Sequence, residues 1–319
     1  MTPGLSAQAS STVGSARVKR RSFLLGSAAV SAAFALDGVS AASARSTVVP
    51  YTQTYLSPGP LAAHPDDACY VIRPRQIRSS SPVVMYLHGA GETATTALGN
   101  STQLTTFLQS LAGLGYTVLV ADFGEPGTGA LTSGSQTFGN HFVAGRMEEY
   151  RQWLATKPAV ASNANASTIG LLGSSMGAAN ALAYARDHRS LVSVAGTAIP
   201  FTDIAWTRSD RTDPVWTANG FLASLCDTAW QLLATDATPP DADFNTLASL
   251  VGLPWRGYYR SDDPIVNPAR LEILQSHIGG SSGIFDVGTT GGHNTNIWGD
   301  LSFSAFTSWF STYLPVPAH

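Results

Sequence analysis

A serine flanked by glycines is the feature of this sequence that most directly predicts chemistry. Residues 168–180 pass from apolar, β-forming residues through the pattern Gly-x-Ser-x-Gly at 173–177 into small helix-forming residues. That order predicts a strand, a sharp turn and a helix, with Ser175 at the turn. Its hydroxyl would stand at a helix N-terminus, where free N–H groups and the helix dipole favour negative charge. The alternative is a Ser/Gly-rich turn without a catalytic role, because such short patterns also arise by chance.

A catalytic serine needs a base, and three further segments offer partners for it. A serine hydroxyl is a weak nucleophile until a neighbouring group takes its proton. His88, Gly89, Ala90 and Gly91 follow an apolar strand-like run. Further along, Asp262 and Asp263 precede Pro-Ile-Val, and two glycines precede His293. Ser174 is the rival nucleophile, although it occupies the variable position of the pattern.

These motifs, in this order, resemble the α/β-hydrolase family of serine esterases, lipases and peptidases over residues 68–315. The resemblance implies that Ser175 is the nucleophile, His293 the base and Asp263 the acid, with Asp262 as the competitor for the acid position. It implies that the backbone N–H groups of Ala90 and Met176 form the oxyanion hole.

Two details of the resemblance concern the His-Gly-Ala-Gly motif. Gly89 or Gly91 could replace Ala90 as the first oxyanion-hole donor. His88 has a structural role in this motif and is not expected to act as the base.

The resemblance predicts a serine hydrolase that cleaves carboxylic esters through an acyl-enzyme, acting on a small-molecule or lipid-like ester; the N-terminal segment described below predicts that it is exported. A peptidase or an acyltransferase with the same triad is the first alternative, and a non-catalytic binding protein on a hydrolase scaffold is the second. No metal and no organic cofactor is expected, and neither zinc-ligand spacing nor a glycine-rich phosphate loop is present.

Strand-like runs alternate with helical patterns along the chain. This alternation predicts an α/β fold with a doubly wound, mostly parallel sheet. Strands are expected at residues 69–72, 83–87, 117–121, 169–172, 191–195, 255–259 and 283–287. Helices are expected at residues 104–114, 143–154, 175–186, 271–278 and 303–313.

Two stretches depart from this alternation. Residues 203–253 contain helical runs and several aromatic residues but no convincing strand, which predicts a helical cap inserted above the carboxyl ends of the strands. Residues 45–67 are rich in Pro, Ser and Thr and are expected to form an irregular lead-in to a hydrolase domain that spans 45–319.

The first 44 residues are predicted to be an export signal. Four basic residues precede an apolar stretch at 23–36, which is too short to span a bilayer comfortably, and small residues at 42–44 offer a cleavage site after Ala44. The run at 19–25, Lys-Arg-Arg-Ser-Phe-Leu-Leu, resembles a twin-arginine signal; an ordinary secretory signal is the alternative. A secreted or extracytoplasmic location follows, with no transmembrane segment in the mature chain.

The composition excludes nucleic acid as a partner. The 319 residues are 44% hydrophobic and 12% charged, and outside the predicted export signal no basic block exists to meet phosphates. The formal charge of −3 becomes −6 when residues 1–44, with four basic residues and one acid, are removed. Cys69 and Cys226 are the only cysteines, and either a disulfide or two free thiols fits an exported chain.

Overall fold

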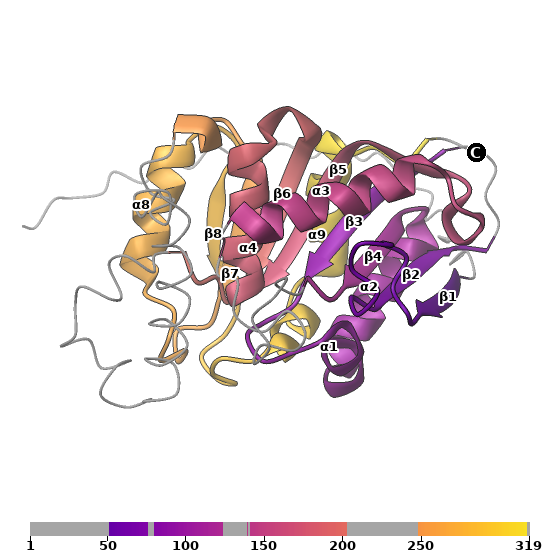
Figure 1. Ribbon diagram of the computed structural model, residues 1–319. Helices are drawn as coiled ribbons and strands as arrows, with labels where there is room; N and C mark the ends of the chain where they lie inside the picture. The colour runs from indigo at the N-terminus through magenta and orange to yellow at the C-terminus, as the bar shows by residue number, and fades with distance from the viewer. Residues whose placement is uncertain (1–50, 76–79, 124–138, 140, 203–247, 318–319) are drawn as a thin grey trace, which may run out of the picture. The chain divides into compact units, whose positions relative to one another are not determined.

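A computed structural model describes residues 51–75, 80–123, 139, 141–202 and 248–317 (Figure 1). All of them belong to one compact unit, Thr47–His319. Its strands are β1 (Tyr51–Leu56), β2 (Cys69–Pro74), β3 (Ser81–Leu87), β4 (Thr117–Ala121), β5 (Ala164–Ser174), β6 (Val192–Ala198), β7 (Trp255–Tyr259) and β8 (Gly283–Asp286). Its α-helices are α1 (Ala94–Asn100), α2 (Thr102–Leu114), α3 (His141–Ala155), α4 (Met176–Asp187), α8 (Pro268–Ile278) and α9 (Phe303–Tyr313).

The strands form one eight-stranded sheet in the order β1-β2-β4-β3-β5-β6-β7-β8. The β1–β2 and β2–β4 pairs are antiparallel, and every other neighbouring pair is parallel. The order runs away from β3 in both directions, as a doubly wound sheet requires, because helical crossovers then cover both faces. The predicted α/β fold with a mostly parallel sheet is confirmed.

Alternate residues of the central strand β3 show how the two faces are filled. Val83, Met85 and Leu87 pack into a core shared with α3 and α4, whereas Val84 and Tyr86 pack into a core shared with α1, α2 and α9. Successive side chains of a strand point to opposite faces, so a strand that is apolar at every position belongs in the middle of three layers. Figure 1 shows α3 and α4 on one side of the sheet and α9 on the other.

Two elements differ from the sequence-based expectation. Part of the supposedly irregular lead-in is β1, which pairs with β2 over its whole length and leaves alternate side chains exposed, as an edge strand does. Helix α1 was also not expected, since its seven residues include Thr, Gly and Asn, which favour helices weakly. A capping box between Thr93 and Thr96 starts it, and Ala94, Ala97 and Leu98 are buried.

Several expectations lie outside the described residues. The expected export signal at residues 1–44 is one of them. Most of the expected cap, residues 203–247, is another; the remainder of it, residues 248–253, is described and contains a 3-10 turn at Ala248–Leu250.

Of the two cysteines, Cys226 also lies outside the described residues. Cys69 is a buried free thiol, and burial raises its pKa to about 12. Among the helices that the structure describes, none has the length and apolar character that crossing a bilayer requires.

Candidate active site

Ser175 occupies a strained turn between β5 and α4. The strand ends at Ser174 and the helix begins at Met176, so Ser175 alone makes the connection. Its backbone has φ 53° and ψ −118°, a conformation that L residues rarely adopt and that costs about 1–3 kcal/mol. A hydrogen bond from its N–H to the carbonyl of Ala198 (3.0 Å) holds this conformation. The strain keeps the hydroxyl at the surface of the turn.

The two glycines of the turn are needed for close packing. A Cβ on Gly173 would overlap the carbonyl of Gly177, and a Cβ on Gly177 would overlap the carbonyl of Leu87 at the end of β3. The start of α4 therefore packs directly on the backbone of β3. No side chain other than hydrogen fits at either position.

His293 lies between Ser175 and Asp263 and contacts both. Its Nε2 is 2.8 Å from Oγ of Ser175, and its Nδ1 is 2.8 Å and 3.1 Å from the two carboxylate oxygens of Asp263. With the imidazole proton on Nδ1, the ring donates to the carboxylate and accepts from the serine hydroxyl. The three side chains form one hydrogen-bonded row, the arrangement that activates a serine for nucleophilic attack.

The loop after β7 separates the roles of the two aspartates. The side chain of Asp263 is fully buried, and its Oδ1 also accepts from the backbone N–H groups of Ile265 (2.8 Å) and Val266 (3.1 Å). The neighbouring Asp262 is exposed and accepts instead from the N–H of Gly292 (3.0 Å). The carboxylate that meets the imidazole is thus that of Asp263.

Ser174 is buried and its hydroxyl is fully engaged. Its Oγ accepts from the hydroxyl of Tyr86 (2.9 Å) and from the indole N–H of Trp298 (2.8 Å). Burial raises the pKa of Tyr86, so its phenol stays protonated and keeps donating. Ser174 therefore stabilises the turn through these two buried hydrogen bonds, and the imidazole of His293 contacts Ser175 instead. The contact with the indole could not be predicted from the sequence, because Trp298 lies 124 residues further along the chain.

The segment after β3 forms a tight turn beside Ser175. The N–H of Glu92 donates to the carbonyl of Gly89 (3.3 Å), and Gly91 has a φ of 75°, as the third residue of a type II turn requires. Within the described residues, the N–H of Ala90 donates no hydrogen bond. The N–H of Met176 follows Ser175 at the start of α4. These are the two donors expected from the sequence.

His88 is buried next to this turn and does not belong to the described lining of the cavity beside Ser175. The side chain is buried, and its Nδ1 is 3.0 Å from the carbonyl of Gly89. Burial lowers the pKa of the imidazole, so the ring is neutral and donates from Nδ1. Its contact orients the Gly89 peptide.

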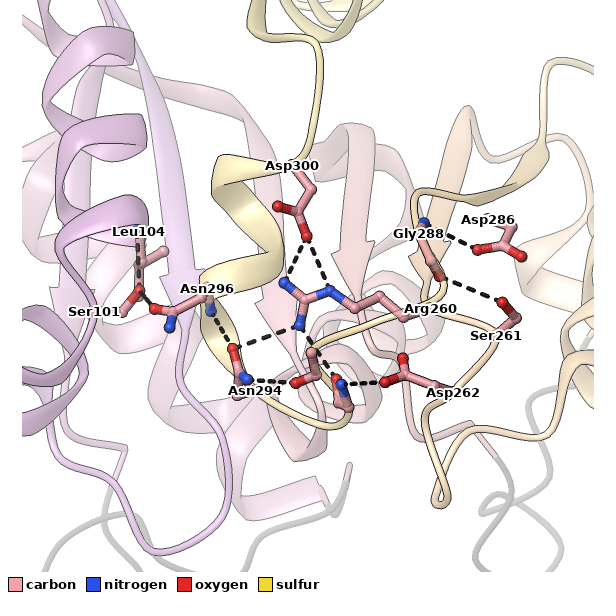
Figure 2. Close-up of polar contacts among 12 residues, drawn as sticks. Ser101, Leu104, Arg260, Ser261, Asp262, Asp286, Gly288, Asn294, Asn296 and Asp300 are labelled. Carbon is pink, nitrogen blue, oxygen red and sulfur yellow. Dashed lines mark hydrogen bonds and ion pairs between the residues drawn. The ribbon is translucent and has the colours of Figure 1, made fainter.

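Arg260 fixes the loop that carries His293 (Figure 2). Its Nη1 donates to the carbonyl of Gly292 (3.2 Å), and its Nε and Nη2 both donate to Asp300. On the other side of the loop, Asp262 accepts from Gly292. Asn294 donates to the carbonyl of Gly291 (2.6 Å). The sequence offered no signal for Arg260, because its partners lie 32–40 residues away.

A cavity of about 330 Å³ is lined in part by Ser175, and its size suits a small ligand. The described residues that line it come from the turn after β3, the elbow and the His293 loop: Gly89, Ala90, Glu92, Asn100, Ser175, Ile199, His293, Asn294, Thr295 and Asn296. No group of three or more His, Cys, Asp or Glu side chains that could hold a metal ion occurs in the part of the chain that the structure describes.

Comparisons with known proteins agree with this architecture. No protein-family model and no curated protein sequence matches the chain. Among solved structures, the chain is similar to a brefeldin A esterase, a bacterial homologue of human hormone-sensitive lipase, with a TM-score of 0.56 and 17% identity over 83% of this chain and 76% of that one.

Two further structures are similar to the same extent. An S-formylglutathione hydrolase from Agrobacterium tumefaciens has a TM-score of 0.58 and 15% identity over 84% of this chain and 97% of its own. A carboxyl esterase from the mycorrhizal fungus Tuber melanosporum has a TM-score of 0.55 and 15% identity, with coverages of 83% and 85%. These likenesses show that the chain has the α/β-hydrolase fold.

Proposed function

We propose that this protein is a serine hydrolase that cleaves carboxylic esters. The observation that carries the proposal is the unbroken row of hydrogen bonds from Ser175 through His293 to Asp263, at a strained turn that faces a cavity. The esterases among proteins of similar fold favour an ester as the bond that is cleaved. Because a fold alone does not define an activity, the support for this proposal comes from the contacts among Ser175, His293 and Asp263.

In the proposed first half-reaction, the hydroxyl oxygen of Ser175 attacks the ester carbonyl while Nε2 of His293 takes the hydroxyl proton. The buried carboxylate of Asp263 stabilises the imidazolium that forms and holds its orientation. The tetrahedral intermediate collapses as the C–O bond to the alcohol breaks, and the imidazolium gives its proton to the departing oxygen. An acyl-enzyme and a free alcohol result.

In the second half-reaction a water molecule gives a proton to His293 and attacks the acyl-enzyme. The acid leaves and Ser175 recovers its proton. In both halves the oxyanion would accept from the N–H groups of Ala90 and Met176. Loss of one such donor typically costs about 2.7–4 kcal/mol of transition-state stabilisation. Within the described residues the N–H of Ala90 donates no hydrogen bond, and Ala90 lines the cavity, which supports its assignment.

The test is turnover of p-nitrophenyl esters by the mature protein and by Ser175→Ala, with Ser304→Ala on the exposed side of α9 as a matched control. The proposal requires turnover that Ser175→Ala abolishes and Ser304→Ala retains, with both variants folded. Equal turnover by Ser175→Ala would refute it. Products formed in the presence of an added alcohol or sugar distinguish hydrolysis from acyl transfer, and peptide substrates test the peptidase alternative.

We also propose that residues 1–44 direct export and are then removed. The basic start, the apolar stretch and the small residues before Arg45 support this proposal. N-terminal sequencing of the protein recovered outside the cytoplasm should begin at Arg45. An intact N-terminus on protein retained in the cytoplasm would contradict export.

A further inference from the structure

Glu92 places a carboxylate in the wall of the same cavity that Ser175 and His293 line. The residue closes the turn after β3, and its Oε2 accepts from the N–H of Gly89 at 2.9 Å. That is the only hydrogen bond its carboxylate makes within the described residues, and no basic side chain there pairs with it. Burial raises the pKa of Glu92, as expected for a partly desolvated acid without a cation.

Among the described residues that line the cavity, the other polar side chains are neutral amides and hydroxyls, apart from the imidazole of His293. Asn100, Thr295 and Asn296 are neutral, and Asn294 is held by its own loop. His293 is engaged with Ser175 and Asp263. In the described lining, then, no cationic side chain pairs with the carboxylate of Glu92.

This charge has a consequence for the reaction proposed above. The carboxylate of Glu92 accepts a hydrogen bond from Gly89. Gly89 directly precedes Ala90, whose N–H is proposed to donate a hydrogen bond to the oxyanion. A negative charge so close to a developing oxyanion raises the energy of the transition state, and the effect is stronger in a partly buried site. A positive charge on the substrate would cancel that penalty and gain a charge-assisted hydrogen bond.

We propose that Glu92 is a specificity-determining residue and that the ester taken by this site carries a protonated amine, which pairs with the carboxylate of Glu92 while Ser175 faces the ester carbonyl. This inference rests on the proposed function. An ester that carries hydroxyl groups in place of an amine fits less well, because a hydroxyl group donates a hydrogen bond to Glu92 but leaves the negative charge of its carboxylate uncompensated.

The test compares esters of equal shape that differ in charge. On the alcohol side, 2-(dimethylamino)ethyl acetate is protonated at pH 7, and 3-methylbutyl acetate is its neutral counterpart. On the acyl side, ethyl 4-(dimethylamino)butanoate is paired with ethyl 5-methylhexanoate. The wild-type protein should prefer the ammonium ester of at least one pair by about tenfold in kcat/KM, the size of a hydrogen bond to a charged group.

The variant Glu92→Gln keeps an oxygen that can accept from Gly89 and removes the charge. Its preference within the favoured pair should fall to about one, because the ammonium ester loses its charged partner and the neutral ester no longer meets an uncompensated charge. Glu272→Gln removes an equal charge from the exposed side of α8 and should keep the tenfold preference. A wild-type protein without preference for either ammonium ester, or a preference that survives in Glu92→Gln, would overturn the proposal.

Binding separates a failure of this inference from a failure of the proposed function. In Ser175→Ala, the dissociation constants of both ammonium esters can be measured by calorimetry without turnover. The dissociation constant of at least one of them should rise about tenfold when Glu92→Gln is added. If the dissociation constants do not change, the role of Glu92 is overturned even if esters are hydrolysed. If a dissociation constant rises but the wild-type protein hydrolyses no ester, the role of Glu92 is retained and the proposed esterase activity is refuted.

Discussion

Two nitrogen atoms of Arg260, Nε and Nη2, donate to the same carboxylate oxygen of Asp300, at 2.9 and 2.6 Å. The pair joins the end of β7 to the end of the 3-10 turn Thr295–Gly299, so it connects the segments on both sides of His293. Only 4% of the Arg260 side chain is exposed, against 41% for Asp300. The buried guanidinium therefore depends on this partner to balance its charge and fix its orientation.

Asp300→Asn should lower kcat about tenfold with a smaller effect on KM. Removal of the charge lets the guanidinium shift from the carbonyl of Gly292, and small misplacements of a catalytic group cost one to two orders of magnitude. Steady-state kinetics on a p-nitrophenyl ester measure kcat and KM separately. Asp66→Asn, which changes an exposed side chain, is the control. An equal kcat in Asp300→Asn would show that the His293 loop holds its position without this pair.

The two neighbouring aspartates should differ sharply in their kinetic effect. Asp263→Asn exchanges the buried acceptor of the His293 Nδ1–H for an amide, which favours the wrong tautomer, so kcat should fall by about three to four orders of magnitude. Asp262→Asn weakens only the hydrogen bond from the N–H of Gly292 and should cost about tenfold or less. The same ester assay ranks them, and the reverse order would assign the acid to Asp262.

Gly177→Ala should destabilise the fold by about 3 kcal/mol or more, because the new Cβ meets the backbone carbonyls of Leu87 and His88 and neither can move aside. Gly145→Ala is the matched control. Gly145 lies in the middle of α3 with nothing within 4 Å of the position of its Cβ, so alanine there should stabilise the helix by about 0.5–1 kcal/mol. Urea denaturation compares the two variants with the wild type.

Glu148 should make a pH-dependent contribution to stability. The Arg151 guanidinium is the main cause that lowers the pKa of this carboxyl to about 2, and the hydroxyl of Tyr184 on α4 assists. A lowered pKa in the folded state stabilises the protein above the ordinary pKa of about 4.5. Glu148→Gln should therefore lower the Tm by about 2–4 °C at pH 7.

The difference in Tm between Glu148→Gln and the wild type should shrink as the pH falls from about 4.5 to about 2, where the folded carboxyl is also protonated. Thermal scans across that range measure it, with Glu272→Gln as the exposed control. A difference that persists unchanged at the lowest pH would mean that shape, and not charge, is what Glu148 contributes.

Periodicity and residue type predicted the central part of the fold. The limits of β4, β7 and α9 agree with the expected ranges, because apolar runs and helical spacing are strong there. Helix α1 was missed because it depends on capping by Thr93 more than on the propensity of its own residues. Edge strand β1 was missed although its Tyr and Thr residues favour strands, because the Pro, Ser and Thr of the surrounding segment favoured an irregular lead-in.

The chain order of the motifs placed Ser175, His293 and Asp263 as candidates, and the fold brings their side chains into contact. The position of Asp263 directly before the proline favoured it as the acid but left Asp262 as a competitor, because adjacent residues differ only in which way the loop turns them. Arg260 and Trp298 could not be recognised at all. Their roles come from contacts with distant segments, which a single sequence does not record.

Labelling of the folded mature protein with a fluorophosphonate, followed by peptide mapping, tests the central claim most directly. The reagent reacts with a serine whose hydroxyl is activated by a neighbouring base. The account predicts one label per molecule, on Ser175, and none in His293→Ala with the fold intact. A folded protein that takes up no label, or that is labelled at another serine, would contradict it.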